Sequence, residues 1–374
     1  MSGLDAAMLA RDVSARSVRK DVWDDFLTWT KRFFVVTDRE VAGTFIDVIQ
    51  AFLHDFDVEH VLHLLGDGLI GAAAESIVGQ IEHDRKTWAP LLASTRAARL
   101  AAAEAAPQLL DLTTPEGRGP VVQVHFDVGN PSVGAALQAN DLRLIREISE
   151  ETRQAVRQFL SARLAQGVNP VNVVQELVGR QQPDGTRQGG VLGLTTRQTQ
   201  AVVNYRHALE TGQREALDRA LRDRRYDPSV QAMLRGERDL SPEQIDRMVN
   251  RYEARFLAYR AETIGRTEAA RAMAAGQQMA WDQAIQDGDV QSTHLVKRWV
   301  TAHDFRVRPE IRLTSKGPRQ SFGFGIEGNH RQMDGQEVEY DEMFTAPDTG
   351  EQVWGPPAGV NCRCIAWIRP RRGL

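Results

Sequence analysis

The sequence predicts a mainly α-helical protein, in which a multi-helix body precedes a small C-terminal α+β or β-rich module. Two observations support this fold class. Apolar residues recur at helical spacing through most of the chain before residue 286. Beyond that point, glycine, proline and short β-prone runs replace the alanine-rich helical pattern. The length of 374 residues is enough for two or three domains, each with a core of its own.

The first hundred residues are predicted to be helical. Their aromatic stripe can form the domain's own core, which is the more common arrangement, or a contact surface for another protein. It contains Trp23, Phe26, Trp29 and Phe33. The alanine-rich stretch 92–106 favours a helix that Pro107 ends. The turn-rich stretch 111–120 then predicts a boundary, so the first predicted domain covers residues 1–115.

A second predicted domain, the helical body, covers residues 121–288. Thr195 can cap a helix that runs to Leu209, and a further helix is expected over about 214–223. The clearest start is Ser241-Pro242-Glu243-Gln244, which combines a capping serine, a proline at the first helical position and a glutamine that can close a capping box. The glycines of Gly189-Gly190-x-x-Gly193 have no Lys-Ser/Thr after them, so they predict a plain loop.

The third predicted domain, residues 289–374, is a loop-rich module with strands expected at Leu295–Thr301 and Cys364–Ile368. A region with so few apolar runs is poorly stabilised by its core alone. Small domains of this kind often gain stability from a bound metal ion, because binding energy then becomes folding energy.

Two cysteines, Cys362 and Cys364, are the only ones in the chain and lie one residue apart. So short a ring strains a disulfide, whereas the two thiolates can readily bind one ion. With His330 and either Asp304 or His303 they predict a structural zinc site, because sulfur and nitrogen ligands suit zinc better than magnesium or calcium. The alternative is a pair of free thiols in a folded protein.

Composition excludes several functional classes. The net charge of −4 argues against a general nucleic-acid coat protein. No apolar run approaches a bilayer-spanning length, so no membrane association is expected. The lack of a disulfide framework favours a reducing compartment such as a cytoplasm. Two arginine clusters, at 222–225 and 369–372, are read as solvated surface. Serine-nucleophile, Walker and Rossmann patterns are absent.

The order of motifs in the second half of the chain resembles phage Mu F-type minor head proteins, the head morphogenesis family of tailed bacteriophages. The resemblance extends over about residues 125–370. It rests on a Leu-Gly-Leu-Thr-Thr-Arg-Gln helix start at 192–198, Arg-Thr-Glu at 266–268, Lys-x-Trp-x-Thr-x-x-Asp-x-Arg-x-Arg at 297–308, His-x-x-x-Asp-Gly at 330–335, Pro-Pro at 356–357 and Asn-Cys-Arg-Cys at 361–364. An insertion at about 311–328 separates His330 from the Arg-x-Arg pair, which is a departure from the family pattern.

This resemblance implies a minor capsid protein of a virion, assembled in the host cytoplasm with portal protein, scaffold or major capsid protein as partners. Some members are thought to accompany DNA on ejection, which implies contact with packaged DNA. The motifs imply structural roles for Arg266, Glu268, Trp299, Arg306 and Arg308. Arg266 is suited to tying its helix to the C-terminal module, although an exposed helical charge pair with Glu262 is the alternative.

An enzymatic function is the competing hypothesis. His303-Asp304 and Asn329-His330 loosely resemble the residues of a metal-dependent His-Asn-His nuclease, in which a histidine activates water and an ion holds phosphate. A toxin-like effector that carries a related module belongs to the same class. The spacing is loose, so no catalytic residue is predicted and the protein is expected not to be an enzyme.

Overall fold

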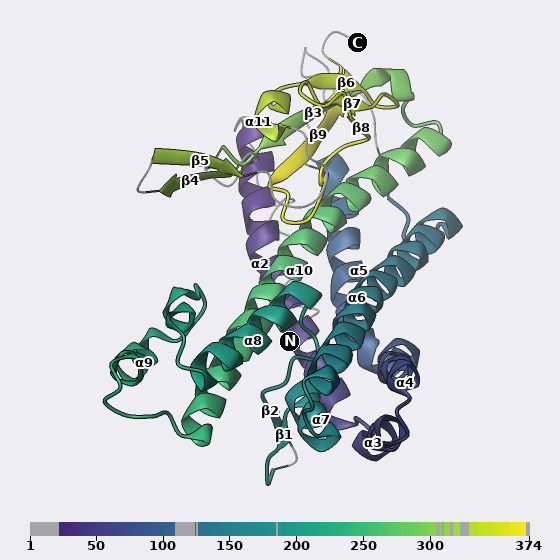
Figure 1. Ribbon diagram of the computed structural model, residues 1–374. Helices are drawn as coiled ribbons and strands as arrows, with labels where there is room; N and C mark the ends of the chain where they lie inside the picture. The colour runs from purple at the N-terminus through teal and green to yellow at the C-terminus, as the bar shows by residue number, and fades with distance from the viewer. Residues whose placement is uncertain are drawn as a thin grey trace. The chain divides into compact units, whose positions relative to one another are not determined.

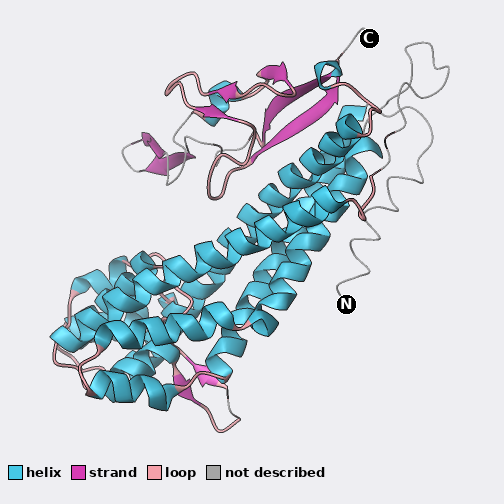
Figure 2. Ribbon diagram, turned by 90° about the vertical axis from the view of Figure 1, so that its right-hand side faces the viewer, coloured by secondary structure: helices cyan, strands magenta, loops and turns pink. Residues whose placement is uncertain are grey.

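The computed structural model describes residues 22–108, 124, 126–184, 186–303, 307, 310–314, 317–321 and 329–371. Within these residues the protein is mainly helical, and most of the strands belong to the C-terminal segment (Figures 1 and 2). The predicted fold class is therefore confirmed. None of the helices in the described ranges is long and apolar enough to cross a membrane.

The chain forms two compact units, each assembled from separate segments. Unit 1 comprises Met1–Ala42, Leu91–Ala139 and Glu262–Leu374, and unit 2 comprises Gly43–Pro90 and Asn140–Ala261. The predicted boundary at 111–120 falls outside the described residues. Separate folding of residues 1–115, 121–288 and 289–374 stays a prediction.

Four long helices contribute residues to both units. They are α2 (Val22–His54), α5 (Arg85–Gln108), α6 (Pro131–Ala165) and α10 (Pro242–Gln286). The predicted capping box opens α10, since the Ser241 amide donates to Gln244 Oε1 (3.0 Å) and the Gln244 amide donates to Ser241 Oγ (3.3 Å). These two bonds satisfy backbone donors that the first turn would otherwise leave without partners.

Unit 2 adds short helices around its parts of the long ones. They are α3 (Val58–Gly66), α4 (Ile70–His83), α7 (Pro170–Val178), α8 (Thr196–Glu210) and α9 (Asp227–Leu234), with a two-residue hairpin of β1 (Arg180–Gln181) and β2 (Arg187–Gln188). Thr195 caps α8 through a capping box, as expected. The loop of Gly189 and Gly190 has positive φ at both glycines.

The prediction of a helix over 214–223 is wrong. Two 3₁₀ turns, η1 (Arg214–Asp218) and η2 (Arg224–Tyr226), occupy this region instead. Asp223 begins the second of these turns, because its carboxylate accepts a hydrogen bond from the Arg225 amide (3.2 Å). Such a local bond starts a new turn in place of a continuous helix.

In unit 1 the aromatic stripe of α2 is buried. Phe26, Trp29 and Phe33 are buried against alanines of α5 and α10. The stripe therefore forms a core, which is the arrangement that the sequence favours. The crossing of α5 and α10 is close, because a Cβ at Gly276 would lie 2.4 Å from the Arg99 carbonyl oxygen.

The C-terminal part of unit 1, residues 292–371, is called the strand module below. Its main sheet has the order β6-β3-β9, all antiparallel. The elements are η3 (Ser292–His294), β3 (Leu295–Thr301), β4 (Glu310–Thr314), β5 (Gly317–Ser321), α11 (His330–Met333), β6 (Glu337–Glu339), β7 (Phe344–Thr345), β8 (Gln352–Val353) and β9 (Cys364–Pro370). The hairpin of β4 and β5 lies in the insertion noted in the sequence.

Strands β3 and β9 have different neighbours on their two faces. Leu295, Ala366 and Ile368 pack against Trp281 at the C-terminal end of α10. Trp367, which points to the other face of β9, packs against the aromatic stripe of α2, with its ring 4.7 Å from that of Trp23. Burial on both faces stabilises a sheet of only three strands.

Candidate metal centre

His330 is positioned by the start of the one-turn helix α11. The side chain of Asn329 caps this turn by accepting a hydrogen bond from the Gln332 amide (3.3 Å). The Asn329 amide in turn donates to Asp348 Oδ1 (2.9 Å), which fixes the entry to the turn. His330 is 1% exposed, so its imidazole points into the strand module.

The two cysteines reach the same place from the turn that leads into β9. Cys364 is the first residue of β9 and pairs with Thr301 at the end of β3. Cys362 is held by its amide, which donates to the Gly359 carbonyl (3.2 Å). Both thiols are free and buried.

The distances among these three side chains match a metal site. Nδ1 of His330 lies 3.6 Å from Cys362 Sγ and 3.5 Å from Cys364 Sγ. A tetrahedral ion with zinc–sulfur bonds of about 2.3 Å and a zinc–nitrogen bond of about 2.0 Å would separate sulfur from nitrogen by about 3.5 Å. All three ligand atoms lie within 4.8 Å of one another. The cluster of His330, Cys362 and Cys364 can therefore hold a metal ion.

The electrostatics of the cysteine pair favour one thiolate at ordinary pH. A hydrogen bond from the Cys364 thiol, with the contact to His330, lowers the pKa of the Cys362 thiol well below its usual range. Burial raises the pKa of the Cys364 thiol well above its usual range, and the charge on Cys362 adds to this effect. The two thiols thus share a proton, and a cation would be needed to hold both as thiolates.

The remaining predicted ligands do not join the described cluster. His303 is exposed, and its Nε2 lies 3.5 Å from Asp334 Oδ2. Asp304 lies outside the described residues, as do Arg306 and Arg308. A fourth ligand and a role for the two arginines therefore stay predictions.

The His-x-x-x-Asp-Gly motif joins α11 to β3. Asp334 Oδ1 accepts a hydrogen bond from the Thr301 amide (2.8 Å). The Gly335 amide donates to the Trp299 carbonyl (2.8 Å), and Gly335 has a φ of 82°, which explains the glycine. Sequence reasoning named this motif without a role for Asp334, whose partner is distant in the chain.

The Arg-Thr-Glu motif contacts the Asn-Cys-Arg-Cys segment and helix α5, as well as a residue of its own helix. Arg266 Nη1 donates to Asn361 Oδ1 (3.2 Å), and Thr267 Oγ1 accepts from the Asn361 amide (3.1 Å). Glu268 is buried on the other side, where its carboxylate pairs with Arg99 of α5 (3.4 Å) and Arg271 (2.7 Å). The contacts made by Thr267 and Asn361 were missed in the sequence, although both residues stand inside recognised motifs.

Lys297 and Trp299 organise the sheet beside the cluster. Lys297 is fully buried, and its Nζ donates to the carbonyls of Glu342 (2.8 Å) and Trp354 (2.9 Å). The same ammonium lies 4.1 Å from the centre of the Trp354 ring. Trp299 packs edge-on against His330, with ring centres 5.4 Å apart. Burial lowers the pKa of Lys297 to about 8.

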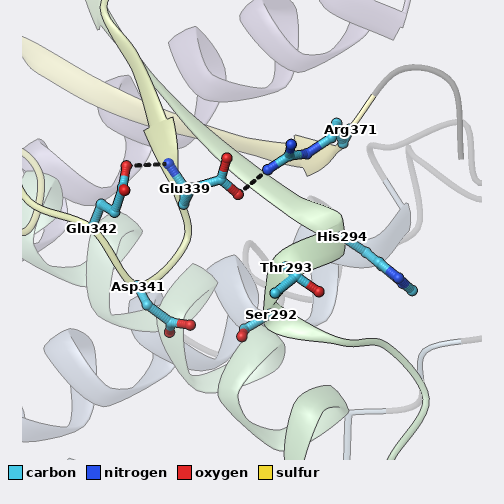
Figure 3. Close-up of a pocket in the computed structure, with 7 residues that line it drawn as sticks. All are labelled: Ser292, Thr293, His294, Glu339, Asp341, Glu342 and Arg371. Atoms are coloured by element: carbon cyan, nitrogen blue, oxygen red, sulfur yellow. Dashed lines mark hydrogen bonds and ion pairs between the residues drawn. The ribbon is translucent and has the colours of Figure 1, made fainter.

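A shallow pocket in the strand module is lined by residues other than the cluster (Figure 3). Two of its three carboxylates serve the module's own contacts, since Glu339 pairs with Arg371 and Glu342 accepts from the Glu339 amide (3.2 Å). The side chain of His294 points away from Glu339. Nothing in this arrangement assembles a nucleophile with a base, so we assign the pocket no chemistry.

Comparison of the chain with protein-family models, with curated proteins and with solved structures found no match in any of the three. The function must therefore be inferred from the residues and contacts themselves.

Proposed function

We propose that the protein is a minor capsid protein of a tailed phage or related particle, which acts with portal protein and scaffold in head assembly. Its strand module would be a rigid docking unit and not a catalytic domain. The observation that carries this proposal is the convergence of dispersed motif residues. Arg266, His330 and Asn361–Cys364, which the resemblance singles out, lie together around one cluster.

We further propose that the ion is zinc and that its role is structural. Two sulfurs and one imidazole nitrogen form a donor set that zinc prefers, whereas magnesium and calcium prefer oxygen. Asp304 is proposed as the fourth ligand, because it follows β3 at the end where Thr301 pairs with Cys364. Four protein ligands would leave no open position for a substrate.

Burial of the cluster favours this structural role over a nuclease. A hydrolytic ion must meet both phosphate and water, but His330, Cys362 and Cys364 are each at most 3% exposed. A site closed to solvent stabilises its surroundings and does not turn over a polymer.

Protein partners are favoured over DNA by four arginines of the two clusters, each of which is paired with a carboxylate. Arg222 pairs with Asp227 (2.8 Å) and Arg225 with Asp223 (2.6 Å). In the second cluster, Arg369 pairs with Glu337 (2.8 Å) and Arg371 with Glu339. Guanidinium groups already paired with carboxylates attract a phosphate backbone less than free ones.

Quantitative mass spectrometry of purified proheads and mature heads tests the proposal. We expect the protein at low copy number relative to the major capsid protein, and we expect zinc at one equivalent per chain in the purified protein. Absence from both kinds of particle would overturn the capsid assignment. Metal-dependent cleavage of phage DNA by the purified protein would favour the enzyme instead.

A further inference from the structure

Alternate residues of the Asn-Cys-Arg-Cys segment contact different parts of unit 1. Cys362 and Cys364 direct their sulfurs at His330. Asn361 contacts helix α10, and the charge of Arg363 acts on Asp38 of helix α2. Four consecutive residues thus join the metal cluster to two helices of unit 1.

Asn361 holds this segment in an uncommon conformation. Its φ is 57°, in the left-handed region that asparagine tolerates better than most residues. The hydroxyl of Thr267 accepts from the Asn361 amide (3.1 Å), and Arg266 donates to the Asn361 side chain (3.2 Å). Because Asn361 and Cys362 share a peptide bond, these contacts restrict the direction in which the Cys362 side chain leaves the backbone.

The helix side of the contact is itself rigid. A Cβ at Gly265 would lie 2.3 Å from the Asp38 carbonyl oxygen and 3.2 Å from Ala42 Cβ, so only glycine permits this approach of α2 to α10. Arg266 follows directly and reaches back to the Asp38 carboxylate (4.0 Å). Burial raises the pKa of Asp38 to about 6, against the opposing charges of Arg266 and Arg363.

We propose that the segment Asn361–Cys364 is a metal-dependent clamp. When the two cysteines bind the ion, Asn361 is held in the conformation in which it contacts Arg266 and Thr267 of α10. The inference rests on the zinc site of the proposed function. Coupling between two sites is reciprocal, so contacts on α10 strengthen metal binding by the same factor by which the metal strengthens the contacts. In a particle, this clamp would keep the strand module attached to its helices while the metal is bound.

A pair of matched threonine variants separates this coupling from general destabilisation. Thr267 donates to the Thr263 carbonyl (2.7 Å) as well as accepting from Asn361. Thr152 in α6, also buried, makes the same kind of helix bond to the Ile148 carbonyl (2.8 Å), and among the described residues its hydroxyl makes no hydrogen bond to the cluster or to α10. Thr267→Val and Thr152→Val therefore remove the same intrahelical bond, and only the first removes the acceptor for Asn361.

The measurement is the zinc dissociation constant of the full chain, obtained by competition with a chromogenic chelator. We expect Thr267→Val to weaken zinc binding about tenfold, which equals about 1.4 kcal/mol, and Thr152→Val to leave it unchanged. Equal affinities of wild type and Thr267→Val would overturn the clamp. A wild-type chain that binds no zinc would overturn the zinc site as well, so the two failures are distinguishable.

Hydrogen exchange of the wild-type chain gives a second test that needs no variant. Removal of zinc should accelerate exchange at the Asn361 amide at least tenfold, because this proton is donated to Thr267. If zinc binds but the exchange rate of this amide does not change, metal binding and the contacts with α10 are independent, and the proposal is refuted.

Discussion

Unit 2 and the strand module differ in the polar side chains that they place away from solvent. Unit 2 uses pairs of opposite charge, among them Arg163 with Glu176 (2.7 Å) and Arg206 with Asp246 (2.8 Å). The strand module buries Lys297 against two carbonyl oxygens and an aromatic ring, and it gathers its thiols and an imidazole into one cluster. The strand module has charge pairs too, Arg369 with Glu337 and Arg371 with Glu339, but among the described residues it alone gathers donor atoms suited to a metal.

This difference follows from the amount of apolar surface that each region can bury. In unit 2, regular helical spacing repeats apolar contacts along each helix, including Val173, Val174 and Leu177 on α7. In the strand module, β6 has three residues, and β7 and β8 have two each, so repeated contacts are few. The module therefore depends on a small number of special residues, and it should fail selectively when they are removed.

Metal removal should produce the largest effect and is the strongest test of the comparison. A chelator, or the double change Cys362→Ser and Cys364→Ser, should accelerate amide exchange in β3 and β9 roughly a thousandfold, a loss of about 4 kcal/mol. Unit 2 amides should exchange as before. Addition of zinc should restore protection in the wild type but not in the double variant. Equal loss of protection in both regions would show that the strand module depends on the metal no more than unit 2 does.

The sequence was most informative where structure is determined by neighbours in the chain. The strand predicted at Leu295–Thr301 coincides with β3, and the predicted capping box opens α10. Local propensity and capping chemistry are enough for such elements. The helix expected over 214–223 is replaced by two 3₁₀ turns, and propensity did not anticipate that Asp223 would accept a hydrogen bond from the Arg225 amide and so begin the second turn.

Contacts between distant residues were predictable only where the residue type restricts its own chemistry. Two neighbouring thiols need a third soft ligand, so His330 could be proposed, and the structure brings its Nδ1 to both sulfurs. Lys297 offers no such restriction, because its partners are backbone carbonyls at 342 and 354 that no side-chain pattern reveals. Thr267 and Asn361 were hidden for the same reason.

The second largest effect should be confined to unit 2 and should depend on pH. Glu253 is buried, accepts a hydrogen bond from the Gly190 amide (2.9 Å), and faces Arg206, Glu176 and Asp246. Burial raises its pKa to about 8, so between pH 4.5 and pH 8 the folded chain keeps a proton that the unfolded chain releases. The free energy of unfolding of unit 2 should therefore fall as pH rises through this window.

Glu253→Gln should abolish this slope, because an amide stays neutral at every pH. At pH 9 the free energy of unfolding of the variant should exceed that of the wild type by about 3 kcal/mol. It is measured by denaturant titration, with unfolding followed by hydrogen exchange of unit 2 amides. The same change at the exposed Glu215 serves as the control and should leave the slope unchanged. A variant that keeps the wild-type pH profile would show that Glu253 does not hold the proton.

The smallest effect should arise beside the cluster, at Trp299. Its indole lies on the same face of the sheet as Cys364 and lowers the pKa of that thiol, although burial is the larger influence and raises it. Trp299→Phe keeps an aromatic ring against His330 but removes the indole N–H, which is buried and makes no hydrogen bond within the described residues. Donors beside a thiolate ligand tune metal affinity, so this N–H is available to do so once a metal is bound. We expect zinc binding to weaken about tenfold, about 1.4 kcal/mol, with its pH midpoint shifted upward. Trp281→Phe, a buried tryptophan of the same unit outside the cluster, should change neither quantity. If both variants bind zinc alike at every pH, the indole only fills space, and the cluster is set by its three ligands alone.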